Sequence, residues 1–171
     1  MPAPKGGIRR LETVEQAVQA VSAARFPPLG RRGITGGRVT GFGEISLSDY
    51  IERANREIRV VPMIERAAGL AALPEILAVP GVSMILEGTL DLALDLGLGL
   101  GPHPMHPEVW TSIRRMAEQC RNAGIPFCAN PRSDEQRDYW REQGIEWLLA
   151  GEDRGVLQTA LRKHLRALRD N

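Results

Sequence analysis

Four short apolar runs alternate with longer stretches of helical period along most of this chain. The runs, at residues 58–65, 81–86, 125–129 and 145–151, have the composition of buried strands. Each run is followed by a stretch whose apolar residues recur at helical spacing. This alternation predicts an α/β fold with a parallel sheet and right-handed crossovers, either an open doubly wound sheet or an arc of a TIM barrel.

The expected helices cover residues 12–26, 67–79, 107–124, 133–144 and 156–168, and the one at 133–144 is expected to be polar apart from Tyr139 and Trp140. The clearest is 107–124, whose buried face should consist of Val109, Ile113, Met116 and Cys120. The last helix is expected to turn one stripe inward, formed by Val156, Ala160, Leu161, His164 and Leu168. Pro62 weakens the first expected strand, because proline cannot donate to a ladder.

Composition and charge exclude several classes of protein. The chain has 171 residues, 43% of them hydrophobic and 25% charged, which is enough for one domain with a real core. A formal net charge of +1 gives no basic footprint for nucleic acid or anionic membranes. No apolar run approaches the ~20 residues of a membrane span, and residues 1–10 lack the apolar core of a signal peptide. We therefore expect a cytoplasmic protein.

Cysteines and glycine-rich stretches add no cofactor motif. Cys120 and Cys128 lack the spacing of a thiolate zinc site and are expected to be buried thiols. "GLGLG" at 97–101 follows a helical turn rather than a strand, so it does not support a dinucleotide fingerprint. "TGGRVTGFG" at 35–43 lacks the lysine of a phosphate-binding loop, and its plainer interpretation is a mobile loop.

Carboxylates follow two of the expected strands. Glu65 is the first charge after the run at 58–65, and Asp91 lies in the loop after the run at 81–86. The carboxyl ends of neighbouring parallel strands meet at one rim, where ligands bind, so this pair would suit Mg²⁺ or Mn²⁺. Carboxylates at strand ends also cap helices, which is the competing interpretation. Asp95 is expected to face solvent, and the sequence leaves the direction of Glu87 open.

The stretch "VVPMIERAAGLAALPEILAVPGVSMILEGTLDLALDLG" at 60–97 resembles the signature of the HpcH/HpaI aldolase family of pyruvate-binding TIM barrels. "ARFPPLGRRG" before it and "HPEV" after it resemble the family in the same order, so the likeness covers nearly the whole chain. Within the family, "RRGITGGRVTGFG", "LEGTLDL", "FCANPR" and "GEDRG" look most like the citrate synthases of siderophore biosynthesis. The usual G-P-A-D is replaced by Gly88-Thr89-Leu90-Asp91.

This resemblance implies a metal-dependent carbon–carbon lyase or condensing enzyme that acts on a 2-oxo acid such as oxaloacetate or pyruvate, with acetyl-CoA as a second substrate in the citrate-synthase branch. Glu65 and Asp91 match the residues that hold the divalent metal, which would stabilise an enolate. The N–H groups of Leu90 and Asp91 match those that cradle the oxo-acid carboxylate. Arg32, Arg38 and Arg132, which fall in expected loops, are candidates for binding a second substrate's carboxylates, although loop arginines often only face solvent.

A complete barrel takes about 250 residues. The resemblance implies that residues 1–171 form a single partial-barrel domain, roughly the second half, without the family's N-terminal strands. The family's base histidine and its oxo-acid arginine match no position here, so the catalytic residues are unknown. His103, His106 and His164 are expected to be structural or exposed to solvent. We expect the chain to form a homo-oligomer or to pair with an N-terminal half-barrel. The alternative to an enzyme is a non-catalytic or complementing subunit that retains the metal and oxo-acid pocket.

Overall fold

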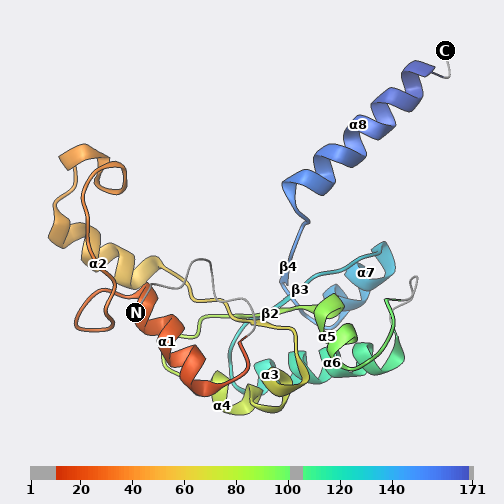
Figure 1. Ribbon diagram of the computed structural model, residues 1–171, viewed down its shortest axis with the longest axis horizontal. Coiled ribbons are helices and arrows are strands. Elements are labelled where there is room, and N and C mark those ends of the chain that lie inside the picture. The colour runs from red at the N-terminus through yellow and green to blue at the C-terminus, as the bar shows by residue number, and fades with distance from the viewer. Residues whose placement is uncertain (1–10, 101–105, 170–171) are drawn as a thin grey trace. The chain divides into compact units, whose positions relative to one another are not determined.

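The structure, a computed structural model, describes residues 11–100 and 106–169 (Figure 1). Its elements in chain order are α1 (Val14–Ala24), the 3₁₀ helix η1 (Arg38–Gly43), α2 (Leu47–Glu57), β1 (Met63–Ile64), α3 (Ala67–Ala71), α4 (Leu73–Leu77), β2 (Ile85–Glu87), α5 (Thr89–Asp95), α6 (Pro107–Asn122), β3 (Phe127–Ala129), α7 (Asp134–Glu142), β4 (Trp147–Leu148) and α8 (Asp153–Arg169). The chain divides into two compact units, the first ending at Cys128 and the second beginning at Ala129. The predicted single domain at 1–171 stays a prediction.

The strands form one sheet in the order β1-β2-β3-β4, and β1, β2 and β3 pair in parallel. The predicted parallel α/β fold is therefore confirmed. Each strand is shorter than the apolar run that predicted it, because only a few residues of each run form a continuous ladder with the neighbouring strand. Ahead of β1 and β2, Val60 and Val82 form an isolated bridge. Pro62 fits this arrangement because its carbonyl accepts a hydrogen bond from Leu86 N at 2.9 Å.

The core of the first unit lies between the strands and the helices that follow them. Met63 pairs with Leu86, and Leu86 with Cys128, in a row of half-buried side chains. The alternate side chains face the core and are buried, as Ile64 and Ile85 illustrate. In Figure 1, α3, α4 and α6 lie together on one side of these strands, and α4 and α5 both pack on α6.

The bounds and the buried face of helix α6 agree closely with the sequence prediction. Its predicted face is fully buried, namely Val109, Ile113, Met116 and Cys120. The helix ends before Gly124, which adopts a positive φ of 67° while Ile125 N donates to the carbonyl of Cys120 at 3.0 Å. Thr13 caps α1 in a capping box with Gln16.

The predicted helix at 67–79 is two short helices instead of one. Ala72 ends α3 and begins α4, and Pro74 stands in the first turn of α4. Proline lacks the N–H that a continuing helix needs at its interior positions, so the chain restarts there.

Two elements, η1 and α2, were not predicted. Helix α2 begins at Ser46, whose hydroxyl accepts from Asp49 N, and it buries Tyr50 and Ala54 beside Phe26. In the glycine-rich segment, η1 is a short 3₁₀ helix in which Phe42 takes a positive φ of 56°.

The predicted inward stripe of the last helix is wrong. Helix α8 has no buried residue, and its large apolar side chains are 51–62% exposed, namely Val156, Leu157, Leu161, Leu165 and Leu168. Helical spacing identifies the face that favours burial, but it does not identify what covers that face. Among residues 11–100 and 106–169, no helix is long and apolar enough to span a bilayer.

Candidate functional site

Glu65 follows β1 directly, at the carboxyl end of the strand. The residue is 6% exposed, and its carboxylate has no hydrogen-bond or ion-pair partner within the described ranges 11–100 and 106–169. Burying an ionised carboxylate without a partner is costly, so a side chain in this position favours a cation nearby.

Gly88 lies opposite Glu65 at the end of β2. Its N–H donates to the carbonyl of Ile64 at 2.9 Å, which continues the β1–β2 ladder by one bond. A Cβ at residue 88 would lie 2.3 Å from Glu65 Cβ and 3.1 Å from Glu65 Oε2. The Glu65 side chain therefore occupies the space beside Gly88, and only glycine leaves that space free.

Asp91 lies three residues farther on, in the first turn of α5. It is exposed, and the part of the chain that the structure describes offers its carboxylate no hydrogen-bond or ion-pair partner. Leu92 N donates to the Gly88 carbonyl at 3.0 Å, which is the first bond of this helix. The N–H groups of Leu90 and Asp91 precede that bond, and no side chain caps the helix at Gly88. Both N–H groups are therefore available at the same end of α5.

The remaining two carboxylates are engaged elsewhere. Asp95 is exposed, as predicted, but it accepts from Arg66 Nη1 at 2.7 Å and from Ala67 N at 2.8 Å, so it holds the start of α3. Glu87, whose direction the sequence left open, is 2% exposed and accepts from Thr89 Oγ1 at 2.8 Å. Glu65 and Asp91 are thus the two carboxylates of this region without protein partners among the described residues.

This donor set fits a hard divalent cation with an incomplete protein shell. Mg²⁺ is commonly held by one or two carboxylates, while water and substrate supply the other oxygens. Within the described residues, no group of three or more His, Cys, Asp or Glu side chains could hold a metal ion on its own. Glu65 after β1 and Asp91 in the first turn of α5 supply two carboxylates, so water and substrate oxygens would complete the coordination.

Arg32 and Arg38 both belong to the first unit but differ in their surroundings. The Arg32 guanidinium stacks over the Phe26 ring at 4.6 Å from its centroid, and its Nη2 donates to the Tyr50 hydroxyl at 3.2 Å. These contacts hold Arg32 against the buried cluster of Phe26, Tyr50 and Ala54. Arg38 is exposed at the start of η1.

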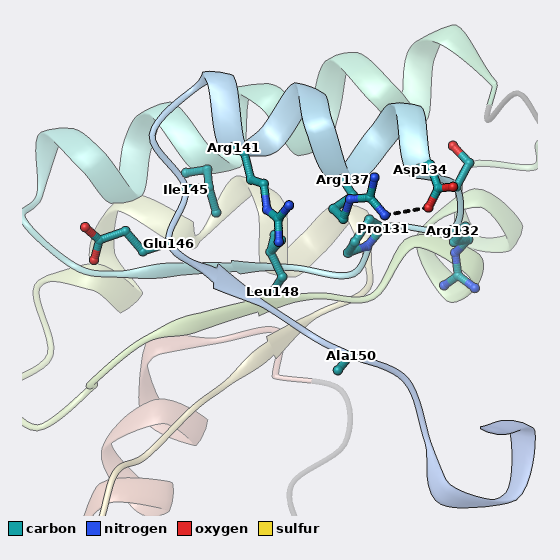
Figure 2. Close-up of a pocket in the computed structure, with 10 residues that line it drawn as sticks. Pro131, Arg132, Asp134, Arg137, Arg141, Ile145, Glu146, Leu148 and Ala150 are labelled. Carbon is teal, nitrogen blue, oxygen red and sulfur yellow. Dashed lines mark hydrogen bonds and ion pairs between the residues drawn. The ribbon is translucent and has the colours of Figure 1, made fainter. Parts of the chain in front are cut away.

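Arg132 lies in the second unit, at a cavity of about 710 Å³ between α7 and β4. Figure 2 shows Arg141 reaching from α7 toward Leu148 of β4, whereas Arg137 extends toward Asp134. Arg137 pairs with Asp134 at 2.6 Å and with Asp138 at 2.9 Å, and the hydrogen bond to Asp138, together with the charges of both carboxylates, raises the pKa of its guanidinium. The Arg132 Nε is buried and has no hydrogen-bond partner within the residues described. The sequence singled out Arg132 alone, although the spacing of Arg137 and Arg141 places them on one helix face.

The cysteines and the described histidines do not belong to the group of carboxylates around Gly88. Burial raises the pKa of Cys120 to about 12, and burial together with the negative charge of Glu87 raises that of Cys128. Cys128 is only half-buried, which corrects the expectation of two buried thiols. His106 caps α6 by accepting from Glu108 N, and His164 is exposed on α8, as predicted for structural or solvent-facing histidines. His103 lies outside the described residues.

Comparison with known proteins gives a consistent family. The model of the HpcH/HpaI aldolase/citrate lyase family matches residues 8–153. A hydroxypyruvate/pyruvate aldolase of Chromohalobacter salexigens is 34% identical over 157 residues, which cover 90% of this chain and 59% of that protein. This chain thus spans about three fifths of the length of that relative.

Solved structures agree with this result. An HpcH/HpaI aldolase from Desulfitobacterium hafniense superposes with a TM-score of 0.79 at 28% identity, covering 94% of this chain and 62% of that one. Citrate synthase SbnG gives a TM-score of 0.77 at 30% identity, covering 94% and 61%. These likenesses confirm the predicted partial TIM barrel.

Proposed function

Because the chain belongs to the HpcH/HpaI aldolase/citrate lyase family, we propose that it binds a divalent metal through Glu65 and Asp91 and acts there on a 2-oxo acid. Membership confirms the resemblance noted in the sequence. Pyruvate and oxaloacetate are the proposed substrates, with carbon–carbon bond cleavage or a citrate-synthase-like condensation as the reaction. A role in siderophore biosynthesis is the more specific form of this proposal.

The observation that carries the proposal is the contrast among four neighbouring carboxylates. Glu87 and Asp95 accept hydrogen bonds from protein groups, whereas Glu65 and Asp91 have no such partner among the described residues. Both residues without partners lie near the carboxyl ends of the strands, where parallel α/β proteins bind ligands. A cation between them would offset the cost of burying Glu65.

Each part of the site has a separate task in this proposal. Glu65 and Asp91 hold the ion, and Gly88 leaves space for the Glu65 side chain. The N–H groups of Leu90 and Asp91 donate to the oxo-acid carboxylate. When bound, the ion supplies Lewis-acid polarisation of the substrate's keto and carboxylate oxygens.

Arginines are the proposed ligands of a second substrate's carboxylates. The guanidinium fork binds carboxylates bidentately, and Arg32, Arg38 and Arg132 all lie in or beside loops. Arg132 has the strongest support, because its buried Nε lacks a partner among the described residues. Acetyl-CoA is the proposed second substrate if the reaction is a condensation.

A second candidate function is that of a complementing subunit. In the sheet, β1 and β4 are the end strands, and each has one neighbouring strand among the described elements. Unpaired strand edges favour association with further strands. A separate N-terminal half-barrel, or a second copy of this chain, would then complete the active site.

The experiment that tests the proposal compares three reactions of the purified 171-residue chain with added Mn²⁺. These are oxaloacetate decarboxylation, pyruvate aldol cleavage and citrate formation from oxaloacetate and acetyl-CoA. We expect decarboxylation above the rate of free Mn²⁺, because this reaction mainly requires a Lewis acid. The other two should be slow, since general-base help worth about 10²–10⁴-fold is assigned to no residue here.

Variants and an added partner distinguish the candidates. Glu65→Gln and Asp91→Asn should each reduce decarboxylation toward the rate of free Mn²⁺. Aldol or citrate activity that develops only after addition of an N-terminal half-barrel would favour the complementing subunit. Decarboxylation no faster than with Mn²⁺ alone would contradict the proposed site.

A further inference from the structure

Buried polar groups gather at the junction of β2 and α5. Four polar or charged residues are buried among those described, and three of them, Glu65, Glu87 and Thr89, lie at this junction or against it. Glu87 is the last residue of β2 and Thr89 the first of α5, so both flank Gly88. The Thr89 hydroxyl donates to Glu87 Oε2 at 2.8 Å, with both residues at most 3% exposed.

This pair costs free energy that an apolar pair would not. A buried carboxylate and a buried hydroxyl give up their hydration, and hydrogen bonds within the protein return only part of that free energy. Buried polar pairs of this kind can contribute conformational specificity in place of stability.

The conformation concerned is the turn from Gly88 to Asp91. Its main chain is tied to β1 through Gly88 N and Ile64 O, and to α5 through Gly88 O and Leu92 N. Helix α5 has no side-chain cap at Gly88, so the side chain of its N-cap residue does not orient its first turn. The hydrogen bond from Thr89 to Glu87 joins that first turn to the end of the strand.

We propose that Glu87 and Thr89 are positioning residues that hold the turn Gly88–Asp91 in the geometry that the metal and the oxo acid require. This inference rests on the proposed function, because it concerns the same site. Neither side chain needs to touch the ion. The hydrogen bond orients the turn that carries the Asp91 carboxylate and the N–H groups of Leu90 and Asp91. Partners of this kind typically change metal affinity about 10- to 100-fold when they are removed.

The test measures the Mn²⁺ dissociation constant by electron paramagnetic resonance, together with the thermal unfolding midpoint. Thr89→Val removes the hydroxyl and keeps the volume, and it should weaken Mn²⁺ binding by about 10- to 100-fold. Thr89→Ser keeps the donor and should bind as the native chain does. If Thr89→Val does not fold, Thr89→Ala removes the same hydroxyl without placing a second methyl group beside Glu87.

Thr40→Val is the matched control. Thr40 is the other buried threonine in the described residues, 2% exposed, and its hydroxyl donates to the Gly37 carbonyl at 3.0 Å. Its loss should lower the unfolding midpoint and leave the Mn²⁺ affinity unchanged. A structural role alone would make Thr89→Val behave like Thr40→Val.

The outcomes separate the two claims. If Glu65→Gln abolishes Mn²⁺ binding but Thr89→Val binds as tightly as Thr40→Val, the positioning role is wrong and the metal site stands. If the native chain does not bind Mn²⁺, or binds it independently of Glu65, the proposed function and this inference both fail.

Discussion

At the scale of single residues, the space beside Gly88 determines the geometry of the site as much as the carboxylates around it do. Glu65 fills that space, and its neighbour Gly88 opens the turn that leads to Asp91. The order of residues along the chain predicted the position of Glu65 at the end of β1. It placed Asp91 in a loop after the next strand, whereas Asp91 lies in the first turn of α5. It could not predict that Arg66 would pair with Asp95 or that Thr89 would pair with Glu87, because those contacts depend on side-chain directions in the folded chain.

Gly88→Ala should disturb both stability and metal binding. Its Cβ would lie 2.3 Å from Glu65 Cβ, so the chain must shift, at a cost of about 1–3 kcal/mol in the free energy of unfolding. Urea denaturation measures this cost. Gly33→Ala is the control, because a Cβ at Gly33 meets nothing within 4 Å. Equal midpoints for the two variants would show that the space beside Glu65 is not filled.

The Cys120 thiol should be inert toward alkylation in the folded chain. Burial raises its pKa from 9.0 to about 12, so little thiolate, the reactive form, exists near neutral pH. The neutral form is favoured by folding, so this contribution to stability is complete below pH 9 and is lost as the pH rises toward 12. Iodoacetamide labelling followed by mass spectrometry checks the first expectation. Labelling of Cys120 as fast in the folded as in the unfolded chain would contradict it.

At the scale of elements, predictability follows from whether a segment carries its own signals. Helix α6 has a proline at its start, a glycine after its end and one apolar face, and it forms where these signals place it. Helix α2 also carries helix signals, namely the capping residue Ser46 and the buried residues Tyr50 and Ala54. The charged residues between them made this buried face difficult to recognise in the sequence. Strand lengths were overestimated because ladder formation depends on the neighbouring strand, which a single run of residues does not contain.

Ile113→Ala tests the importance of α6. Its side chain is fully buried among the helix and strand residues of the first unit, so removing it should lower the unfolding free energy by about 2–5 kcal/mol. Arg114→Ala changes the adjacent, exposed residue and should stay within about 0.5 kcal/mol of the native value. Chemical denaturation of both variants provides the comparison, and a loss below 1 kcal/mol for Ile113→Ala would contradict the packing described.

At the scale of the whole molecule, α8 and the end strands of the sheet have surfaces suited to association. The large apolar side chains of α8 are at least half exposed, and β1 and β4 each have one neighbouring strand among the described elements. Contiguous exposed apolar surface of this kind usually marks an interaction site. The sequence correctly predicted that this helix is amphipathic. The periodicity of α8 does not indicate which surface covers its apolar face.

We therefore expect the purified chain to be a dimer or a larger assembly at micromolar concentration. Leu161→Asp, which places a charge in the apolar stripe, should shift the assembly toward the monomer in multi-angle light scattering. Thr159→Asp adds the same charge on the polar side of α8 and should leave the mass unchanged. A monomeric native chain with a cooperative thermal transition would contradict this expectation.

The central claim is that Glu65 and Asp91 together hold a divalent metal, and a direct titration with Mn²⁺ tests it. We predict that the native chain binds one ion and that Glu65→Gln and Asp91→Asn each weaken binding by at least about tenfold, because affinity for hard cations depends on the number of charged oxygen ligands. Glu75→Gln, which neutralises an exposed glutamate of α4, should bind as the native chain does. Unchanged affinity in both site variants, or an equal loss in Glu75→Gln, would contradict the claim.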